Sequence, residues 1–328
     1  LTEVFHEVVV RAAPKSLPLY VRRLFSVTDC KKLLPSALSA AGCPTLSGLS
    51  SAPRKAPRQI VPPSSGQIYN NFLYICRAMR IKVFMLSLLI ALLPSCGAAK
   101  VVEYRVKVVK EYPHDVTSYT QGLFFHGDRF YESTGEWGSS TLRIVDIETG
   151  MPQKKVSFND KYFIEGSIVF GDELYVLTWT NKVVFKYDPE SLAYKSTQGY
   201  PREGWGMTTD GKQIIASDGS SQLYFMDKDL KVNKKLKVTL NGRPVRYLNE
   251  LEWIDGKIWA NVYTTDLIVV IDPKSGEVVS TVDCTGLLPA KLRTQETDVL
   301  NGIAYKDGHI YLTGKNWPRL YEVELIKK

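Results

Sequence analysis

Short apolar strands alternate with Gly/Asp turns in five similar units between residue 119 and the end of the chain. Each unit has an apolar strand, a Gly-Asp or Asp-Gly turn, a second strand, a short loop and a third strand that ends in an acidic residue. Such a turn between apolar strands predicts a hairpin, because the turn requires positive φ. The turn glycines lie 40 to 52 residues apart and are Gly127, Gly171, Gly211, Gly256 and Gly308. A period of this length made of hairpins is typical of propeller blades.

The predicted fold class is therefore all-β, a five-bladed β-propeller, with an open array or a sandwich as the alternative. A fourth, outer strand is expected after each third strand, at residues 153–157, 194–197, 232–240 and 277–283. The fifth unit has almost no chain left for one. Residues 102–109 alternate between apolar and polar side chains, which indicates a strand. We expect this segment to close the ring as the outer strand of the last blade, since closure removes an exposed sheet edge.

Residues 1–78 differ in character from the rest of the chain. They are rich in Pro, Ser, Ala and Arg, and they have no acidic residue after Asp29 and no persistent hydrophobic period. Such a composition cannot bury a core. Because the chain begins with Leu, we expect residues 1–78 to be a non-native or disordered extension from an over-extended reading of the gene.

Residues 79–99 have the order of a secretory signal peptide. Met79 is followed by Arg80 and Lys82, by an apolar run at residues 83–93, and by a small-residue exit. The apolar run would span about 17 Å as a helix, too short for the ~30 Å hydrocarbon core of a bilayer, so a transmembrane helix is the weaker interpretation. Residues 93–96 resemble a bacterial lipobox in which Cys96 is lipidated.

Ordinary signal cleavage is the alternative to a lipobox, since Pro94 is atypical of that motif. In either case we expect an exported bacterial protein, either periplasmic or a lipoprotein held to the membrane at Cys96. Residues 100–328 would form its folded domain.

The net charge of +8 is misleading as a sign of nucleic-acid binding. Residues 1–100 hold 13 of the 42 basic residues but only 3 of the 34 acidic ones, so the remainder of the chain is close to neutral. A phosphate-binding surface has little support, and we expect no nucleic-acid partner.

Metal and thiol chemistry are poorly supported by the sequence. The four histidines, His6, His114, His126 and His309, have no metal-ligand spacing, and no nucleophile-elbow motif supports a Ser/His/Asp triad. Cys284 is the single cysteine after residue 100, so the main domain has no internal disulfide. A small buried apolar residue is the preferred interpretation of Cys284, and a catalytic thiol is the alternative.

Polar and aromatic residues gather at equivalent ends of the predicted strands. The first strands of a propeller line its channel, so residues before the first strands and after the second strands are expected to converge on one mouth. An apolar wall with few polar groups suits a small or peptide ligand. Taken singly, a Trp is more often core, and an Asn or Gln is more often a turn cap. The candidates are Tyr119, Gln121, Phe163, Glu165, Trp205, Asn249, Glu250 and Asn301 before first strands, and Trp137, Trp179, Tyr263, Lys315, Asn316 and Trp317 after second strands.

These residues resemble the plant- and bacterial-type glutaminyl-peptide cyclotransferases (glutaminyl cyclases), five-bladed β-propellers unrelated in fold to the zinc-dependent animal type. The resemblance covers residues 104–325 and is carried by YTQGL at 119–123, FIEG at 163–166, LTWTN at 177–181, EGWGM at 203–207, YLNELEWIDGKIWANVY at 247–263, LNGIAY at 300–305 and TGKNWPRLYEV at 313–323. Tyr119 and Tyr263 stand where Phe and Trp are frequent in the family, which leaves substrate preference open. The family's pocket residues fall on Tyr119, Gln121, Phe163, Glu165, Trp179, Trp205, Asn249, Tyr263 and Lys315.

The resemblance implies that the α-amine of a peptide attacks the γ-carboxamide of its own N-terminal glutamine, which yields pyroglutamate and ammonia. The amine must be neutral, the ring-closing conformer must be held, the oxyanion needs a donor, and the leaving nitrogen needs a proton. We assign Glu165 as the proton shuttle, and Lys315 and Asn249 to the oxyanion or the side-chain amide. Gln121 would fix the substrate N-terminus, and the aromatic residues would form the wall.

No metal or other cofactor is implied for catalysis, although a structural ion such as calcium is compatible with the channel. The expected partners are peptides or proteins with N-terminal glutamine, bound by a monomer. One alternative is a non-catalytic propeller that binds a peptide or protein at the same mouth, because propellers host many functions. Another is a hydrolase or lactonase with a channel metal, but its ligands are mostly missing at the strand starts.

Overall fold

The computed structural model describes residues 100–328, which form strands β1 to β22 and one short 3-10 helix, η1 (Ala290–Leu292). This confirms the all-β prediction for the described part of the chain. No helix within it is long and apolar enough to cross a membrane. The predictions for residues 1–78 and 79–99, including lipidation of Cys96, lie outside the described residues.

Three sheets of four antiparallel strands follow one another along the chain. In each sheet the strands pair in chain order, as the repeated units predict. The first sheet contains β2 (Thr120–His126), β3 (Arg129–Thr134), β4 (Thr141–Asp146) and β5 (Met151–Ser157). The second contains β6 (Ile164–Phe170), β7 (Glu173–Thr178), β8 (Val183–Tyr187) and β9 (Tyr194–Gly199). The third contains β10 (Met207–Thr209), β11 (Ile214–Ser217), β12 (Gln222–Met226) and β13 (Val232–Lys237).

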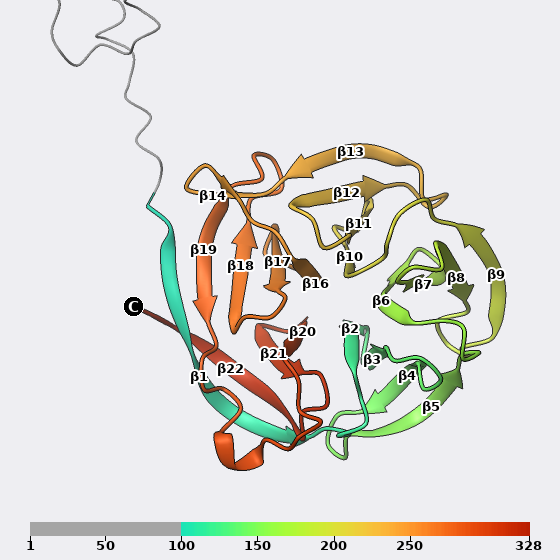
Figure 1. Ribbon diagram of the computed structural model, residues 1–328, viewed down its shortest axis with the longest axis horizontal. Coiled ribbons are helices and arrows are strands. Elements are labelled where there is room, and N and C mark those ends of the chain that lie inside the picture. Colours follow the sequence, from blue (N-terminus) through green and yellow to red (C-terminus); the bar gives the residue numbers. More distant parts are fainter. Residues whose placement is uncertain (1–99) are drawn as a thin grey trace, which may run out of the picture. The chain divides into compact units, whose positions relative to one another are not determined.

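The remaining strands form one eight-stranded sheet and a small hairpin. The large sheet has the order β16-β17-β18-β19-β1-β22-β21-β20. Figure 1 shows the sheets arranged around a common centre, with β2, β6, β10, β16 and β20 innermost. The hairpin is β14 (Thr239–Leu240) and β15 (Arg243–Pro244). The bounds in the large sheet are β16 (Leu248–Ile254), β17 (Lys257–Val262), β18 (Leu267–Ile271), β19 (Val278–Asp283), β20 (Leu300–Lys306), β21 (His309–Gly314) and β22 (Arg319–Lys327).

The first strand, β1 (Val102–Pro113), links the two ends of the described chain. It pairs antiparallel with β22 from Tyr104 to Pro113, and its first residues pair parallel with β19. The strand is longer than the alternating segment at residues 102–109. Tyr104 and Arg105 therefore pair on both sides, with β19 and with β22.

The Asp-Gly turns adopt the backbone conformation that the sequence predicts. Asp255 and Gly256 have φ of 47° and 74°, and Asp307 and Gly308 have φ of 50° and 89°. Positive φ at both central residues matches the right-handed twist of the flanking strands. These two turns join β16 to β17 and β20 to β21.

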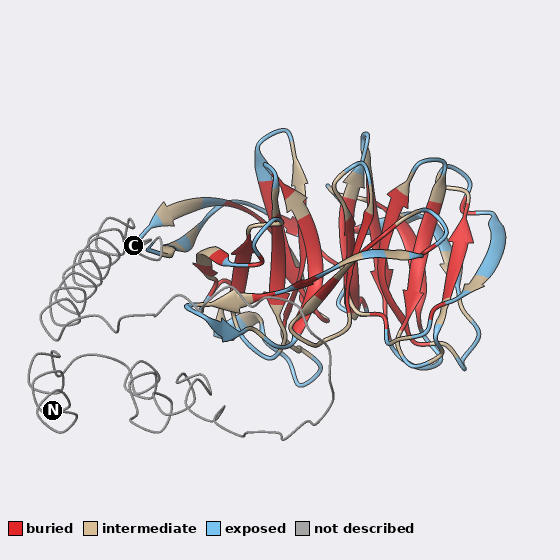
Figure 2. Cartoon of the chain, turned by 90° about the horizontal axis from the view of Figure 1, so that it is seen from above, coloured by how far each residue is buried: buried red, intermediate tan, exposed pale blue. Residues whose placement is uncertain are grey.

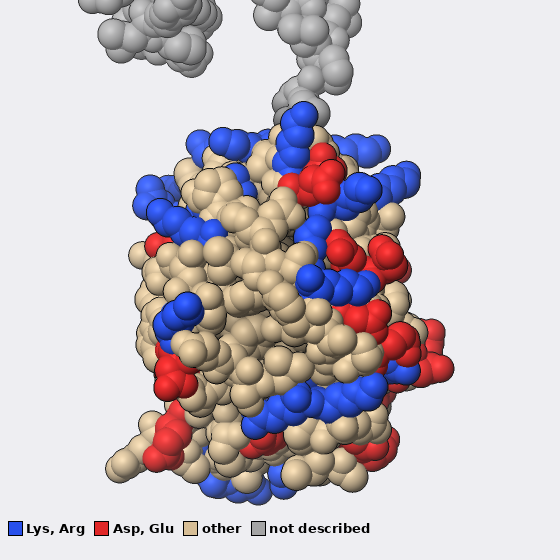
Figure 3. Space-filling view, turned by 90° about the vertical axis from the view of Figure 1, so that its right-hand side faces the viewer, with Lys and Arg blue, Asp and Glu red and all other residues tan. Residues whose placement is uncertain are grey.

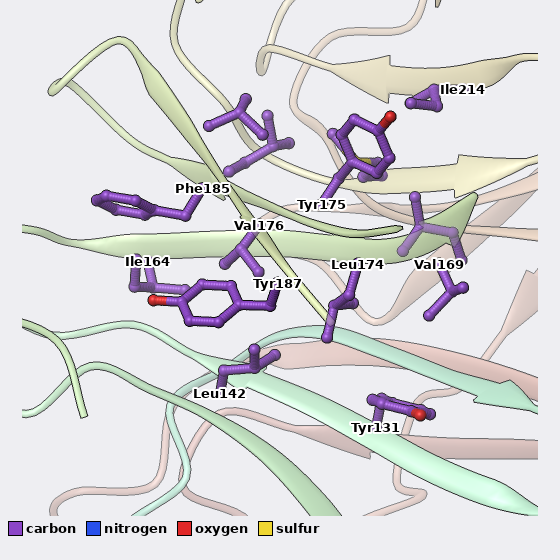
Figure 4. Close-up of a cluster of buried hydrophobic side chains, with 14 of the residues drawn as sticks. Tyr131, Leu142, Ile164, Val169, Leu174, Tyr175, Val176, Phe185, Tyr187 and Ile214 are labelled. Carbon is purple, nitrogen blue, oxygen red and sulfur yellow. The ribbon is translucent and has the colours of Figure 1, made fainter. Parts of the chain in front are cut away.

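Apolar residues between neighbouring sheets form the core. Figure 2 shows buried residues running through the strands, while loops and outer strands are exposed. One cluster contains Tyr131 of β3, Ile164 of β6 and Ile214 of β11, so it joins three sheets (Figure 4). Cys284 is buried in another cluster, and burial raises the pKa of its thiol. The preferred interpretation of Cys284 as a buried apolar residue is therefore correct.

Candidate active site

Four innermost strands begin with the same irregularity. In β2, β6, β16 and β20 the pairing register shifts just after the first residue of the strand. A bulge of this kind bends the strand and re-aims a side chain. The second residues of these strands are all buried polar side chains: Gln121, Glu165, Asn249 and Asn301. The sheets therefore place four polar groups at equivalent positions around the centre.

Glu165 is a carboxyl group that is almost completely shielded from solvent. Its residue is 5% exposed, and no group within residues 100–328 donates a hydrogen bond to its carboxylate. Burial raises the pKa of Glu165 well above its ordinary value; Lys315 opposes that rise and Glu203 adds to it. A carboxyl group with a raised pKa binds a proton more readily than an ordinary glutamate does.

Lys315 lies between two aromatic rings directly after β21. Its Nζ is 4.4 Å from the centre of the Tyr119 ring and 4.9 Å from that of the Tyr263 ring. Burial lowers the pKa of Lys315, while Glu165 is the strongest of the acidic groups that oppose this effect. The two rings stabilise the ammonium by cation–π attraction. Glu165 and Lys315 thus each change the pKa of the other.

The aromatic residues continue from Tyr119 around the site. The ring of Phe163 lies edge-on to Tyr119 at 6.2 Å and to Trp179 at 5.5 Å between centroids. Trp205 lies edge-on to Tyr263 at 5.6 Å. These edge-to-face contacts are favourable arrangements for aromatic pairs.

Glu203 joins these two groups of aromatic residues. Its Oε2 accepts hydrogen bonds from Nε1 of Trp179 at 3.0 Å and from Nε1 of Trp205 at 3.2 Å. The contacts run from Tyr119 to Phe163 and Trp179, through Glu203 to Trp205 and Tyr263, and on to Lys315, which contacts Tyr119 again. We call this ring of contacts the closed circuit, and its aromatic members the aromatic wall. Six of the residues that the sequence places at the mouth belong to this circuit: Tyr119, Phe163, Trp179, Trp205, Tyr263 and Lys315.

Hydrogen bonding fixes which end of the Gln121 side chain is free. Nδ2 of Asn301 donates to the backbone oxygen of Thr120 at 2.9 Å, which sets the orientation of the Asn301 amide. The same Nδ2 lies 3.3 Å from Oε1 of Gln121. Nε2 of Gln121 is then left without a partner in the described residues. Gln121 consequently presents a hydrogen-bond donor, which suits a carbonyl oxygen of a ligand better than an ammonium.

Asn249 has a hydrogen bond at its backbone oxygen but none at its side-chain oxygen within the described residues. Its backbone oxygen accepts a bond from Oγ of Ser217 at 2.7 Å. Its Oδ1 is buried with no hydrogen-bond partner among the described residues. A buried carbonyl oxygen without a partner is costly, so Asn249 is suited to accept an N–H from a ligand.

Three further residues bear on this site in ways the sequence did not predict. Glu203 lies two residues before Trp205 in EGWGM, but it also accepts from Trp179, which lies in a different loop, and nothing local in the sequence indicates that contact. Asp298 accepts the Tyr119 hydroxyl at 2.8 Å from a loop with no strand pattern. Asn301 was a candidate from its place before a strand, but the resemblance gives it no role.

Two of the candidate tryptophans lie outside this circuit of contacts. Trp317 is fully buried, packs against Gly314 and donates from Nε1 to the backbone oxygen of Asp298. Its role is therefore structural. Trp137 is 49% exposed at the edge of the aromatic wall, where it meets Phe163 at 5.6 Å.

The described residues contain no group of three His, Cys, Asp or Glu side chains that could hold a metal ion. His114 and His309 each pair with a single glutamate. On the face shown in Figure 3, basic and acidic side chains are interspersed, so this face has no continuous basic surface.

The comparisons with known proteins agree with this geometry. The sequence model of the glutamine cyclotransferase family matches residues 82–325. The glutaminyl-peptide cyclotransferase of Arabidopsis thaliana is 40% identical over 241 residues, which is 70% of this chain and 75% of the relative. The crystal structure of Myxococcus xanthus glutaminyl cyclase superposes with a TM-score of 0.66 at 36% identity, over 70% of this chain and 100% of that one. The chain therefore belongs to the glutamine cyclotransferase family.

Proposed function

We propose that this protein converts the N-terminal glutamine of peptides to pyroglutamate and releases ammonia, without a catalytic metal. The observation that carries the proposal is the closed circuit of aromatic contacts that holds Lys315 where its charge acts on the buried carboxyl group of Glu165. We further propose that the sheets are five propeller blades, with β1 as the outer strand of the last. Its pairing with β22 supports this arrangement.

Glu165 would move the proton that the reaction requires. The α-amine nitrogen forms a bond to Cδ of its own glutamine, and its proton passes to the Glu165 carboxylate. The tetrahedral intermediate then breaks its bond between Cδ and the amide nitrogen. Glu165 returns the proton to that nitrogen, which leaves as ammonia. A carboxyl group with a raised pKa suits both transfers, because general acid–base catalysis is best near the working pH.

Lys315 and Gln121 would stabilise the oxygen on which negative charge develops. Both present N–H donors, and Lys315 also supplies positive charge in a site of low polarity. Oδ1 of Asn249, which has no partner in residues 100–328, would accept an N–H of the substrate's carboxamide. Gln121 was expected to fix the substrate N-terminus; its free donor favours a carbonyl oxygen instead.

The aromatic wall would hold the substrate in its folded, ring-closing conformer. The flexible glutamine side chain then loses its conformational freedom on binding. The bound substrate therefore has less entropy left to lose at the transition state than the free peptide has. The alternative is a non-catalytic propeller that binds peptides. Such a protein would not need a buried carboxyl group that can accept a proton from the bound peptide.

Metal independence, the monomeric state and export are further parts of the proposal. The lack of a three-ligand cluster in residues 100–328 supports the first of these. A structural ion in the channel would lie near Glu250 and Glu252. The carboxylates of these residues already accept hydrogen bonds from neighbouring strands, so they would have to bind the ion in addition to these bonds.

The decisive experiment measures ammonia released from a glutaminyl dipeptide by the purified protein. We expect turnover that persists in the presence of a chelator and vanishes when the substrate's α-amine is acetylated. Binding of the dipeptide without ammonia release would favour the non-catalytic alternative. Reversible loss of turnover with chelator would contradict metal independence.

A further inference from the structure

A buried histidine–glutamate pair lies behind the candidate active site and takes no part in the proposed chemistry. His114 directly follows β1, and Glu132 lies on β3. Nε2 of His114 is 2.9 Å from Oε1 of Glu132, and both side chains are almost completely buried. Nδ1 of His114 is 2.7 Å from the backbone oxygen of Trp317.

The partners of His114 determine its protonation. A backbone oxygen only accepts, so Nδ1 must carry a hydrogen. Oε1 of Glu132 faces Nε2 and also accepts a bond from Oγ1 of Thr120 at 2.8 Å. An imidazolium satisfies both acceptors, because each of its ring nitrogens is a donor.

Glu132 is tied to the segment that carries Tyr119, directly before β2. Its Oε2 accepts from Oγ of Ser118 at 3.1 Å, and its Oε1 accepts from Thr120. These are the two residues on either side of Tyr119. The carboxylate thus fixes the backbone from which the Tyr119 ring projects.

His114 is tied to the loop that carries Lys315. Besides the bond from Nδ1 to Trp317, its backbone N–H donates to the oxygen of Pro318 at 3.2 Å. The backbone N–H of Asn316 donates to the oxygen of Ser118 at 2.7 Å. The pair therefore bridges the segment that presents Tyr119 and the segment that presents Lys315.

We propose that His114 is a positioning residue whose imidazolium, through Glu132, holds Lys315 against the Tyr119 ring in the geometry that catalysis requires. The inference rests on the proposed function, because it assigns Lys315 to the reaction. His114 itself does not touch the substrate. Its effect on turnover passes through the position of Lys315.

The acidic groups around His114 favour its protonated form. Glu132 faces it from β3, and Asp115 adjoins it in the same loop. Arg143 of β4 is a cation that bonds to Asp115 at 2.8 Å and lies 3.8 Å from Glu132. Burial alone would lower the pKa of His114, but the charge and hydrogen bond of Glu132 hold it above its ordinary value. Burial would likewise raise the pKa of Glu132, but His114 and Arg143 hold it below the usual range.

The chain offers a matched control for this pair. His309 and Glu322 form a second histidine–glutamate contact, at 2.7 Å, with His309 largely exposed at the start of β21. We expect His114→Gln to lower kcat about 10- to 100-fold with little change in KM. His309→Gln should leave both constants within about twofold of the wild type.

A double-mutant cycle separates positioning from general destabilisation. If His114 acts through Lys315, His114→Gln should lower kcat in the wild type but have almost no further effect in the Lys315→Met background. Thermal unfolding of each variant reports whether it is folded. An unchanged kcat in His114→Gln, or the full loss repeated in the Lys315→Met background, would overturn the proposal.

A measurement on the wild-type protein needs no variant and does not depend on turnover. Heteronuclear NMR of the histidine rings should show both nitrogens of His114 protonated at about pH 7. As pH rises and His114 loses its proton, kcat should fall over the same range. A neutral His114 ring at neutral pH would refute the inference even in an active enzyme, whereas a charged ring in a protein that releases no ammonia would refute the proposed function alone.

Discussion

At the scale of single residues, the surroundings of each buried glutamate decide its acidity. Glu132 accepts hydrogen bonds from three side chains and faces two basic residues, which together outweigh the cost of burial. Glu165 has a single nearby cation and no hydrogen bond within the described residues, so burial dominates. One residue type therefore provides a carboxyl group with a lowered pKa behind the site and one with a raised pKa within it.

Replacing Glu165 with Gln tests the proton shuttle. The substitution keeps the size and polarity of the side chain but removes its capacity to accept a proton. We expect kcat for a glutaminyl dipeptide to fall about 100-fold or more, with a smaller change in KM. Steady-state ammonia release measures both constants.

Glu136 provides the control for the loss of charge near the site. It is exposed in the loop between β3 and β4, and its charge also acts on Lys315. We expect Glu136→Gln to change kcat by less than about threefold. An equal loss in both variants would mean that the electrostatic field, and not proton transfer, accounts for the effect of Glu165.

Replacing Gln121 with Glu tests the polarity of its amide. Oε1 can still accept from Asn301, but an ionised carboxylate has no N–H to give a substrate oxygen. We expect kcat/KM to fall about 10-fold or more. Gln153→Glu on the exposed strand β5 is the matched control and should retain full activity. A gain in kcat/KM for Gln121→Glu would instead indicate that this side chain binds the substrate's ammonium.

At the scale of elements, strands and turns were predictable because they depend on local sequence. Apolar runs and the Asp255–Gly256 turn specify a hairpin wherever they occur. The bulges that aim Gln121 and Glu165 were not predictable, because register depends on the partner strand. The same holds for Glu203 and Asp298. Each contacts residues from other elements, and no local pattern records those contacts.

Gly206, directly before β10, shows how closely the chain there approaches the innermost strand β16. A Cβ at this position would lie 2.0 Å from the backbone oxygen of Asn249 and 2.8 Å from Cα of Glu250. We expect Gly206→Ala to lower the free energy of unfolding by about 1–3 kcal/mol and to reduce activity by displacing Asn249. Denaturant titration and ammonia release measure the two effects.

Gly199 is the control for this substitution. It ends the outer strand β9, and a Cβ there would meet nothing within 4 Å. Gly199→Ala should change the free energy of unfolding by less than about 0.5 kcal/mol. A Gly206→Ala protein as stable as Gly199→Ala would show that the segment before β10 can move away from β16 at little cost.

At the scale of the whole molecule, two carboxyl groups of β16 connect the innermost strands across the centre. Glu250 accepts the backbone N–H of Leu123 in β2 and of Ile303 in β20. Glu252 accepts the N–H of Tyr305 in β20 and the hydroxyl of Thr208 in β10. Strands far apart in sequence are thus joined by side chains where no ladder of backbone hydrogen bonds runs between them.

These central carboxyl groups should make the stability of the folded domain fall as pH rises. Burial raises the pKa of Glu252 to about 8, and burial and the charge of Glu252 raise that of Glu250 well above its ordinary value. The native state therefore keeps protons that the unfolded chain releases above its ordinary glutamate pKa of about 4.3. The free energy of unfolding must then decline between that pH and about 8.

Glu252→Gln removes one of these protons and the charge that acts on Glu250. Its amide can still accept from Tyr305 and donate to the hydroxyl of Thr208. We expect the variant to lose less stability than the wild type between about pH 5 and about pH 8, as measured by urea unfolding. Glu277→Gln, at an exposed position before β19, should follow the wild-type curve. If the wild type and Glu252→Gln decline in parallel, the central carboxyl groups do not control how the folded domain responds to pH.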